Sequence, residues 1–152
     1  MKIYRYKNNT LKTEELITKS ITDYLPLKFS PKILRNENGK PYFKDLNVHI
    51  GVTHTDDITI VAFHEENFGI DCETPSRTIQ FSSKISDRYF SAKEKELSFI
   101  KAWTRKEAYA KFLGTRLFNV LSTDTFSLSG TFEFLEEYDL TICIYTEKNA
   151  SL

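Results

Sequence analysis

The sequence has few of the features that mark a secreted or membrane protein. It contains only two cysteines, Cys72 and Cys143, and neither stands in a CxxC or Cys/His spacing. The pattern therefore suggests neither a zinc site nor a disulfide framework. No apolar run approaches the roughly 20 residues that cross a bilayer, and residues 1–10 lack the apolar stretch of a signal peptide. We therefore expect a cytoplasmic protein with no membrane partner.

An excess of charge of one sign is also absent. The 152 residues include 21 Lys and Arg and 21 Asp and Glu, so the charge balance gives no indication of a nucleic-acid partner. Internal repeats, low-complexity tracts and Pro/Gly-rich linkers are missing as well. A chain of this length without a linker suits one core. We expect a single domain over residues 1–152.

What the sequence does contain is a mixture of strand and helix patterns. Residues 13–24 have apolar side chains at helical spacing, and residues 36–40 form a turn pattern of Asn and Gly. Residues 48–53 and 58–63 are β-rich runs separated by a short polar stretch, which predicts a hairpin. Further strands are expected at residues 1–6, 68–73, 123–128, 130–134 and 139–146.

The longest expected element is one helix over residues 91–113. Ser91 and Glu94 have the spacing of a capping box at its start, and Gly114 is suited to its end. Together with the strands, this helix predicts an α+β fold class. The expected architecture is an antiparallel or mixed β-sheet packed against one long helix.

Two carboxylates mark the strand expected at residues 68–73. Side chains two apart in a strand point to the same face, so Asp71 and Glu73 share one face while Ile70 and Cys72 share the other. Two like charges side by side favour a bound cation. The alternative is a solvated acidic pair at the end of an edge strand.

The long helix adds Glu107 and Lys111 to these acids. Both interrupt the apolar stripe that starts at Leu97, Ile100 and Trp103, although they could equally form an i,i+4 ion pair on the helix surface. If Glu107 faces the strand, three carboxylates converge, and oxygen ligands without His or Cys favour Mg²⁺ over zinc. Lys111 would then stabilise charge on a phosphate.

Two further segments could hold a phosphate. His54 lies between the hydroxyls of Thr53 and Thr55 at a strand-to-turn junction, and Pro41 fixes the backbone next to Lys40. The alternative for the first segment is a capped turn whose polar side chains satisfy only the backbone. The alternative for Lys40 is an ordinary solvated lysine.

These segments, in their order along the chain, resemble the 4'-phosphopantetheinyl transferase superfamily. Five segments of the family have counterparts in this chain. They are Gly-Lys-Pro, Ser-His-Ser, Gly-Ile-Asp-Ile-Glu, the start of the long helix, and Trp-x-x-Lys-Glu-Ala-x-x-Lys within that helix. The counterparts are Gly39-Lys40-Pro41, Thr53-His54-Thr55, Gly69-Ile70-Asp71-Cys72-Glu73, Phe90-Ser91 with Glu94, and Trp103-Thr104-Arg105-Lys106-Glu107-Ala108-Tyr109-Ala110-Lys111. The resemblance implies the family's fold and an enzyme that moves the 4'-phosphopantetheine arm of coenzyme A onto a serine of an acyl or peptidyl carrier protein, with release of 3',5'-ADP.

The resemblance also implies a role for each matched residue. Asp71, Glu73 and Glu107 would bind the cofactor Mg²⁺, which would hold the pyrophosphate of coenzyme A. Contacts to coenzyme A phosphates would come from Lys40, Thr53 and His54. Glu107 would deprotonate the carrier serine directly or through a metal-bound water. Lys111 would stabilise or protonate the departing 3',5'-ADP.

The chain departs from the family pattern at its N-terminal side. It is closer to the surfactin-synthetase-activating type, which has two similar halves, than to the short holo-acyl-carrier-protein synthases. Residues 1–68 would form a reduced N-terminal half and residues 69–152 the metal-binding and catalytic half. No motif identifies the residues that grip the 3'-phosphate of coenzyme A; the candidates are Lys28, Lys32 and Arg35. Arg116 stands where the family often has a glycine.

The sequence leaves other functions and the oligomeric state open. A magnesium phosphohydrolase could use the same three carboxylates with water as the nucleophile. A non-enzymatic relative could bind only carrier protein or coenzyme A. A monomer and a homo-oligomer are both compatible with the sequence.

Overall fold

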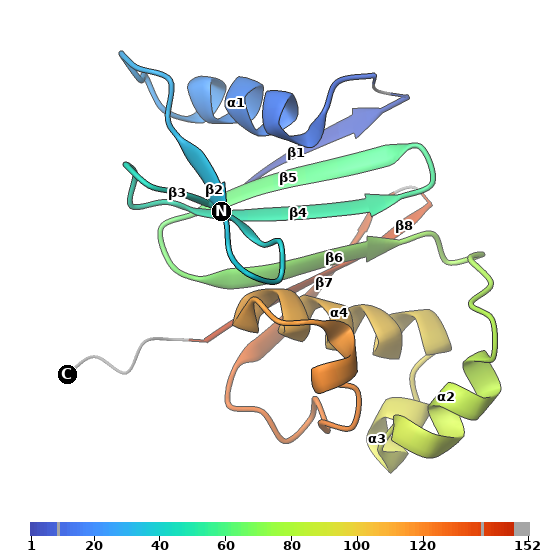
Figure 1. Ribbon diagram of the computed structural model, residues 1–152. Helices are drawn as coiled ribbons and strands as arrows, with labels where there is room; N and C mark the ends of the chain where they lie inside the picture. Colours follow the sequence, from blue (N-terminus) through green and yellow to red (C-terminus); the bar gives the residue numbers. More distant parts are fainter. Residues whose placement is uncertain (9, 138, 148–152) are drawn as a thin grey trace.

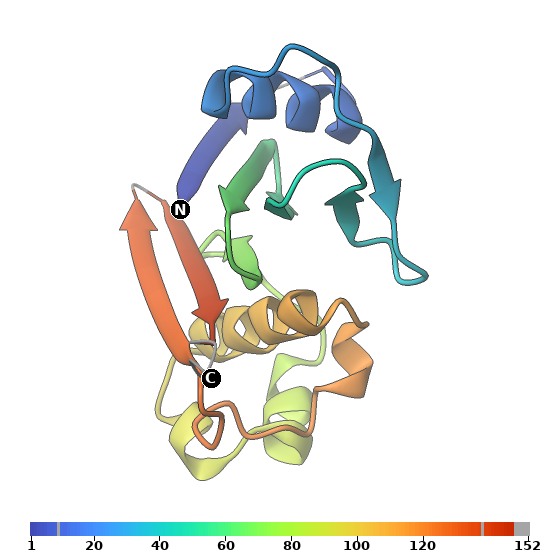
Figure 2. The ribbon, with the colours of Figure 1, turned by 90° about the vertical axis from the view of Figure 1, so that its left-hand side faces the viewer.

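The computed structural model describes residues 1–8, 10–137 and 139–147, and it arranges them as helix, sheet, sheet and helix (Figures 1 and 2). The upper sheet contains β1 (Lys2–Lys7), β5 (Ile58–His64) and β4 (His49–Thr55), in that order. The lower sheet contains β6 (Phe68–Glu73), β8 (Leu140–Thr146) and β7 (Thr131–Glu137), in that order. Neighbouring strands in both sheets run antiparallel.

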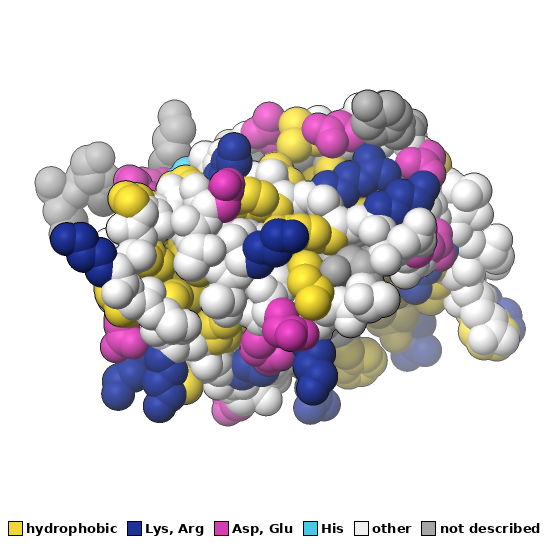
Figure 3. Space-filling model, turned by 90° about the horizontal axis from the view of Figure 1, so that it is seen from above, with side chains coloured by type: hydrophobic (Ala, Val, Ile, Leu, Met, Phe, Trp, Pro, Cys, Tyr) yellow, Lys and Arg dark blue, Asp and Glu magenta, His cyan; other side chains and the backbone are white. Residues whose placement is uncertain are grey.

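The outer face of the upper sheet is covered by α1 (Thr13–Tyr24). Its apolar residues Leu16, Ile17 and Ile21 recur on one face of the helix and pack on Val61 and Phe63 of β5. The opposite face of α1 is polar. On this side of the molecule, seen from above in Figure 3, Lys and Arg side chains are interspersed with Asp and Glu.

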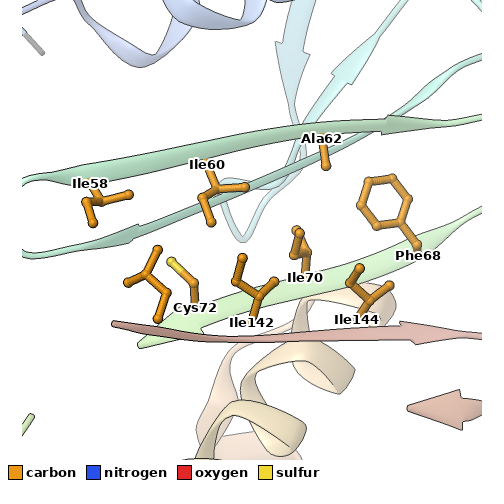
Figure 4. Close-up of a cluster of buried hydrophobic side chains, with 9 residues drawn as sticks. Ile58, Ile60, Ala62, Phe68, Ile70, Cys72, Ile142 and Ile144 are labelled. Atoms are coloured by element: carbon orange, nitrogen blue, oxygen red, sulfur yellow. The ribbon is translucent and has the colours of Figure 1, made fainter. Parts of the chain in front are cut away.

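The inner core lies between the two sheets (Figure 4). Its side chains come from alternate positions of β5, β6 and β8, because residues two apart in a strand share a face. They are Ile58, Ile60, Ala62, Phe68, Ile70, Cys72, Leu140, Ile142 and Ile144. The lower sheet is therefore buried on both faces, since its other face packs against α4 (Phe99–Leu113) through Ala108, Cys143 and Tyr145.

A small hairpin and several short helices complete the fold. The hairpin joins β2 (Ile33–Arg35) to β3 (Pro41–Phe43) through the turn expected at residues 36–40, in which Gly39 has a φ of +87°. The short helices are α2 (Ser82–Tyr89), α3 (Ala92–Lys95) and η1 (Leu117–Asn119). No helix in the described part of the chain is both long and apolar enough to cross a membrane.

Most sequence expectations for the fold are confirmed. The class is α+β with antiparallel sheets, the hairpin of β4 and β5 forms, and α1 and β6 have the expected bounds. β1, β7 and β8 also lie where strands are expected, to within a few residues. The expected single sheet is wrong, because the strands divide into two three-stranded sheets and a hairpin.

The expected continuous helix over residues 91–113 is also wrong. Ser91 and Glu94 do form a capping box, but they cap only the short α3. The Ser98 side chain then accepts a hydrogen bond from the backbone N–H of Lys101 and starts α4 as a new helix. Gly114 ends α4 with a φ of +66°, as expected.

The strand expected at residues 123–128 does not form, and α2 was not expected at all. Thr125 bonds through its backbone N–H and its hydroxyl to Oε1 of Glu94, so the segment binds a buried side chain in place of a neighbouring strand. No residue of α2 is buried. Ile85 and Tyr89 are its only large apolar or aromatic side chains, too few to establish a helical period over eight residues.

Candidate active site

A pocket of about 420 Å³ opens between the upper half of the molecule and α4. Its walls come from the β2–β3 hairpin, β4, β6, the C-terminal part of α4 and the segment that follows α4. The charged or titratable side chains that line it are Arg35, Lys40, His54, Glu107, Lys111 and Arg116. Four of the seven residues singled out in the sequence, Lys40, His54, Glu107 and Lys111, therefore meet at one pocket.

Gly69 allows α4 to lie directly on β6. A Cβ atom at this position would overlap the carbonyl oxygen of Ala108 and would stand 2.6 Å from the backbone nitrogen of Phe112. Asp71 follows two residues later on the same face of β6, so it also points at α4. Lys111 meets it there, with 2.7 Å between Nζ and Oδ1 of Asp71.

Asp71 is buried and only partly satisfied. Its Oδ1 accepts hydrogen bonds from Lys111 and from the hydroxyl of Thr53, the latter at 2.9 Å. Its Oδ2 is buried and has no hydrogen-bond partner in the described residues. A buried carboxylate oxygen without a partner is costly, so this atom is a position where a bound cation or donor would stabilise the site.

Glu73 follows Asp71 by two residues on the same face of β6 and is also buried. Its Oε2 accepts a hydrogen bond from the hydroxyl of Thr55 at 3.0 Å, and its Oε1 pairs with the guanidinium of Arg77. Thr53 and Thr55 thus connect β4 to β6 through side-chain hydrogen bonds, although the two strands belong to different sheets and are not paired through their backbones. The sequence pattern did not identify Arg77, which follows β6 by four residues in an irregular segment.

Glu107 faces the same group of charges from α4. Burial, followed by the negative charge of Asp71, raises the pKa of the Glu107 carboxyl to about 7. The alternative of a solvated ion pair between Glu107 and Lys111 does not hold, because Lys111 pairs with Asp71 across the elements. The helix and the strand therefore bring acids and a lysine together, as the sequence pattern predicts.

The three carboxylates are the type of ligand that a hard cation prefers. Asp71, Glu73 and Glu107 offer only oxygen donors, which Mg²⁺ prefers, and Asp71 has a free buried oxygen. In residues 1–8, 10–137 and 139–147, however, no group of three or more His, Cys, Asp and Glu side chains is already drawn together around one metal position. Lys111 and Arg77 instead hold Asp71 and Glu73.

Lys40 lines the pocket from a largely buried position. Its Nζ donates to Oδ1 of Asn67 at 3.0 Å and to the carbonyl oxygen of Phe112 at 3.2 Å, near the C-terminus of α4. A cation is favourable at this end of a helix because of the helix dipole. Burial lowers the pKa of Lys40 to about 8. Lys40 is therefore not an ordinary solvated lysine. Its ammonium group stabilises the C-terminal end of α4 through the hydrogen bond to Phe112.

The neighbours Thr53 and His54 point in opposite directions from β4. The Thr53 hydroxyl is buried, donates to Asp71, accepts from the backbone N–H of Cys72, and lies outside the pocket lining. His54 lines the pocket and lies 3.0 Å, through Nδ1, from the hydroxyl of Thr59. Burial and then the charges of Lys111 and Arg35 lower the pKa of His54.

Arg35 and Arg116 line the pocket although no motif selected them as site residues. Asn36 and Asn38 both donate to the carbonyl oxygen of Gly114, at 3.0 and 3.1 Å, and so fasten the β2–β3 hairpin to the end of α4. Arg35 directly precedes this contact on the hairpin, and Arg116 follows it by two residues on the other side. Only the fold brings these two arginines to one pocket.

The same region of the chain matches known proteins. Residues 67–149 match the model of a family described as the 4'-phosphopantetheinyl transferase superfamily. A 4'-phosphopantetheinyl transferase, gsp of Aneurinibacillus migulanus, is 30% identical over 95 residues, which cover 55% of this chain and 38% of that protein. A second, psf-1 of Bacillus pumilus, is 31% identical over 133 residues, which cover 79% of this chain and 56% of that protein. The chain thus matches between 38% and 56% of the length of these curated relatives.

Proposed function

Because the chain belongs to the 4'-phosphopantetheinyl transferase superfamily, we propose that it transfers the 4'-phosphopantetheine arm of coenzyme A to a serine of an acyl or peptidyl carrier protein. The second product is 3',5'-ADP. The observation that carries the proposal is the pocket in which Glu107 and Lys111, beside the buried Asp71, meet the side chains of Lys40 and His54. This combination suits a substrate with several phosphates and a reaction that needs a base.

Glu107 is the residue we assign as the proton acceptor. Its carboxyl lines the pocket, and the pKa of about 7 that burial gives it in the metal-free site would fall when a cation binds, which leaves an ionised carboxylate able to accept a proton. In this role Glu107 takes the proton of the carrier serine hydroxyl as the serine oxygen attacks the β-phosphate of coenzyme A. The bond from that phosphorus to the oxygen that bridges it to the 3',5'-ADP phosphate then breaks.

Lys111 is assigned to the leaving group. Its ammonium group lies 2.7 Å from Asp71 and is partly exposed to the pocket. A cation in this position stabilises the negative charge that develops on the departing 3',5'-ADP, which is the main demand of phosphoryl transfer. The ion pair with Asp71 holds the Lys111 ammonium in this orientation until the phosphates arrive.

The residues that would hold Mg²⁺ are Asp71, Glu73 and Glu107. Their oxygen donors and the unpartnered Oδ2 of Asp71 support this assignment. When bound, Mg²⁺ would neutralise the pyrophosphate and so make it a better electrophile. Arg77 must then leave Glu73, or share the carboxylate with the cation.

The three residues expected to contact phosphates receive different roles. His54 is assigned to a phosphate, because it is exposed and lines the pocket. Lys40 has three N–H donors and uses two on Asn67 and Phe112, so one remains for a phosphate. Thr53 has a single O–H donor, which Asp71 accepts. We therefore revise its expected role and assign Thr53 to positioning Asp71.

Mass spectrometry of an apo carrier protein tests the proposal. The carrier is incubated with the full chain, coenzyme A and Mg²⁺, and with the Glu107→Gln variant as a matched negative control. We expect the carrier serine to gain one phosphopantetheine only with the wild-type chain. Hydrolysis of coenzyme A without carrier would favour a phosphohydrolase, and binding without any chemistry on several carriers would favour a non-enzymatic relative.

A further inference from the structure

Two basic side chains hold the acids of β6 that are assigned to Mg²⁺. Lys111 pairs with Asp71, and Arg77 pairs with Oε1 of Glu73. The other oxygen of Glu73, Oε2, accepts a hydrogen bond from the hydroxyl of Thr55. Both oxygens of Glu73 therefore have a partner already. A cation that binds this carboxylate meets the positive charge of Arg77 there.

A tight turn brings Arg77 back to Glu73. β6 ends at Glu73, and Thr74-Pro75-Ser76-Arg77 follows as a β-turn in which the backbone N–H of Arg77 donates to the carbonyl oxygen of Thr74 at 3.0 Å. Proline is favoured at the second position of such a turn, because its fixed φ matches the turn geometry. The chain thus reverses just beyond the strand, and the guanidinium returns to the carboxylate four residues before it. The local sequence is sufficient to build this pair.

Lys111 and Arg77 differ in how freely they can leave their acids. Lys111 belongs to α4, which packs on the lower sheet. Arg77 belongs to the irregular segment between β6 and α2, in which residues 75–78 are exposed. No residue of α2 is buried, and Figure 1 shows this helix at the outer edge of the molecule. Arg77 can therefore move away from Glu73 without disturbing the core.

Sharing of Glu73 between Arg77 and a divalent cation is unfavourable. The carboxylate is buried, and like charges repel each other more strongly where water is scarce. Building on the metal assignment of the proposed function, we propose that Arg77 is a built-in counter-ion of Glu73 that a divalent cation displaces. Arg77 thereby sets the cation affinity of the site. It neutralises the buried acid until the cation arrives, and the cation has to compete with it.

Titration calorimetry with Mn²⁺ alone, without coenzyme A or a carrier, tests the competition. Mn²⁺ prefers the same oxygen ligands as Mg²⁺. We expect the Arg77→Gln chain to bind Mn²⁺ about tenfold more tightly than the wild type, since a hydrogen bond between charged groups contributes about that factor. Arg88→Gln, which removes the same charge from the exposed face of α2, should bind Mn²⁺ as the wild type does.

A double variant shows whether the effect depends on Glu73. Glu73→Gln alone should weaken Mn²⁺ binding, because it removes a charged ligand. On this background Arg77→Gln should add no affinity, since the carboxylate for which Arg77 competes is gone. An Arg77→Gln chain with the wild-type affinity, or a gain of affinity that persists in the double variant, overturns the inference.

Urea unfolding measures the same competition independently. Without a cation, Arg77→Gln leaves the buried Glu73 carboxylate with the hydroxyl of Thr55 and no positive partner. This chain should then be less stable than the wild type by about 1.4 kcal/mol, the equivalent of a tenfold change in affinity. At saturating Mn²⁺ the two chains should be equally stable, because Arg77 has left Glu73 in the wild type as well. A deficit that persists at saturating Mn²⁺ contradicts the displacement.

The outcome is separable from that of the proposed transfer, because neither experiment contains coenzyme A or a carrier. If Glu73→Gln weakens Mn²⁺ binding but Arg77→Gln does not strengthen it, the metal assignment stands and this inference is wrong. If both variants behave as expected but the wild-type chain modifies no carrier, the inference stands and the proposed transfer is wrong.

Discussion

Residues 2–64 and residues 68–146 build one topology twice. In each half the first strand lies at the edge and pairs with the last, giving the orders β1-β5-β4 and β6-β8-β7, and one helix covers the outer face. Figure 2 shows α1 at the top and α4 at the bottom, with the two sheets between them. The two halves therefore provide an internal comparison of one architecture with two sets of side chains.

The halves differ where the first strand faces its helix. In the first half Tyr6 of β1 meets Ser20 of α1 through a neutral hydrogen bond of 2.7 Å. In the second half Asp71 of β6 meets Lys111 of α4 through an ion pair, also at 2.7 Å. Glu107 adds a further acid on the same helix. The topology accommodates both pairs, so the chemistry comes from the side chains and cannot be inferred from the topology.

The largest expected effect comes from removing Glu107, the acid of α4 that lines the pocket. Glu107→Gln keeps the shape of the side chain but cannot accept a proton, so transfer to a carrier should fall by a factor of about 10² to 10⁴. The rate is measured by mass spectrometry of the carrier. Glu96→Gln, on the exposed end of α3, is the matched control and should keep full activity.

A smaller loss at Glu107 would remove it from the mechanism. Transfer within threefold of the wild-type rate is incompatible with its role as the base. The unfolding transition is followed in parallel, because an unfolded variant would also be inactive. The expected result is a folded, inactive chain.

The second effect concerns a buried ion pair for which the described part of the first half has no counterpart. Lys106 and Glu94 are both fully buried, with 2.9 Å between Nζ and Oε1. Lys106→Met leaves the Glu94 carboxylate without its cation, so the free energy of unfolding should fall by about 3 kcal/mol. Urea unfolding measures the change, with Lys93→Met on the exposed face of α3 as the control. Equal losses in the two variants would contradict a stabilising role for the buried pair.

The third effect concerns the closeness of helix and strand in the second half. Gly69→Ala adds a methyl group against the backbone of Ala108 and Phe112, so α4 must move away from β6. We expect a loss of about 1–3 kcal/mol in stability and reduced transfer, because Glu107 and Lys111 move with the helix.

The matched change for Gly69→Ala is Gly51→Ala. A Cβ atom at Gly51 meets the side chains of Phe68 and Ile70 at 2.5 Å, and its three nearest atoms all belong to β6. It should also reduce stability, but although Gly51 lines the pocket, a folded Gly51→Ala chain should lose less of its transfer rate per folded molecule than the Gly69→Ala chain, because α4 is not pushed directly. Equal loss of that rate in the two variants would show that the contact between α4 and β6 has no special role.

The sequence predicted which residues share a face of one strand or one helix, because the periodicity of each element determines this. Alternation along β6 placed Asp71 and Glu73 on one face, and helical spacing placed Glu107 and Lys111 on one face of α4. Gly114 likewise predicted the end of α4, because its φ of +66° disfavours other residues. These are properties of a single element, so the sequence alone contains them.

Contacts between elements could not be predicted in this way. Arg116 joins Arg35 at the pocket only because Asn36 and Asn38 fasten the hairpin to Gly114, which lies more than 70 residues away along the chain. The partner of Thr53 was likewise unknown, because it depends on β4 and β6 lying at facing edges of two sheets. The role of a polar side chain follows from its partner, and the partner comes from the fold.

The smallest expected effect lies in the first half, at the neutral pair. Tyr6→Phe removes one hydroxyl from a partly buried hydrogen bond to Ser20, which keeps its own bond to the carbonyl oxygen of Leu16. The free energy of unfolding should therefore fall by only about 1 kcal/mol, seen as a lower urea midpoint with an unchanged m-value. Transfer to a carrier should keep its wild-type rate, since α1 contributes no charged group to the carboxylate end of the pocket. A Tyr6→Phe chain that is fully folded but slow in transfer would mean that both helix-facing pairs act on the site, and that the chemical division between the two halves is wrong.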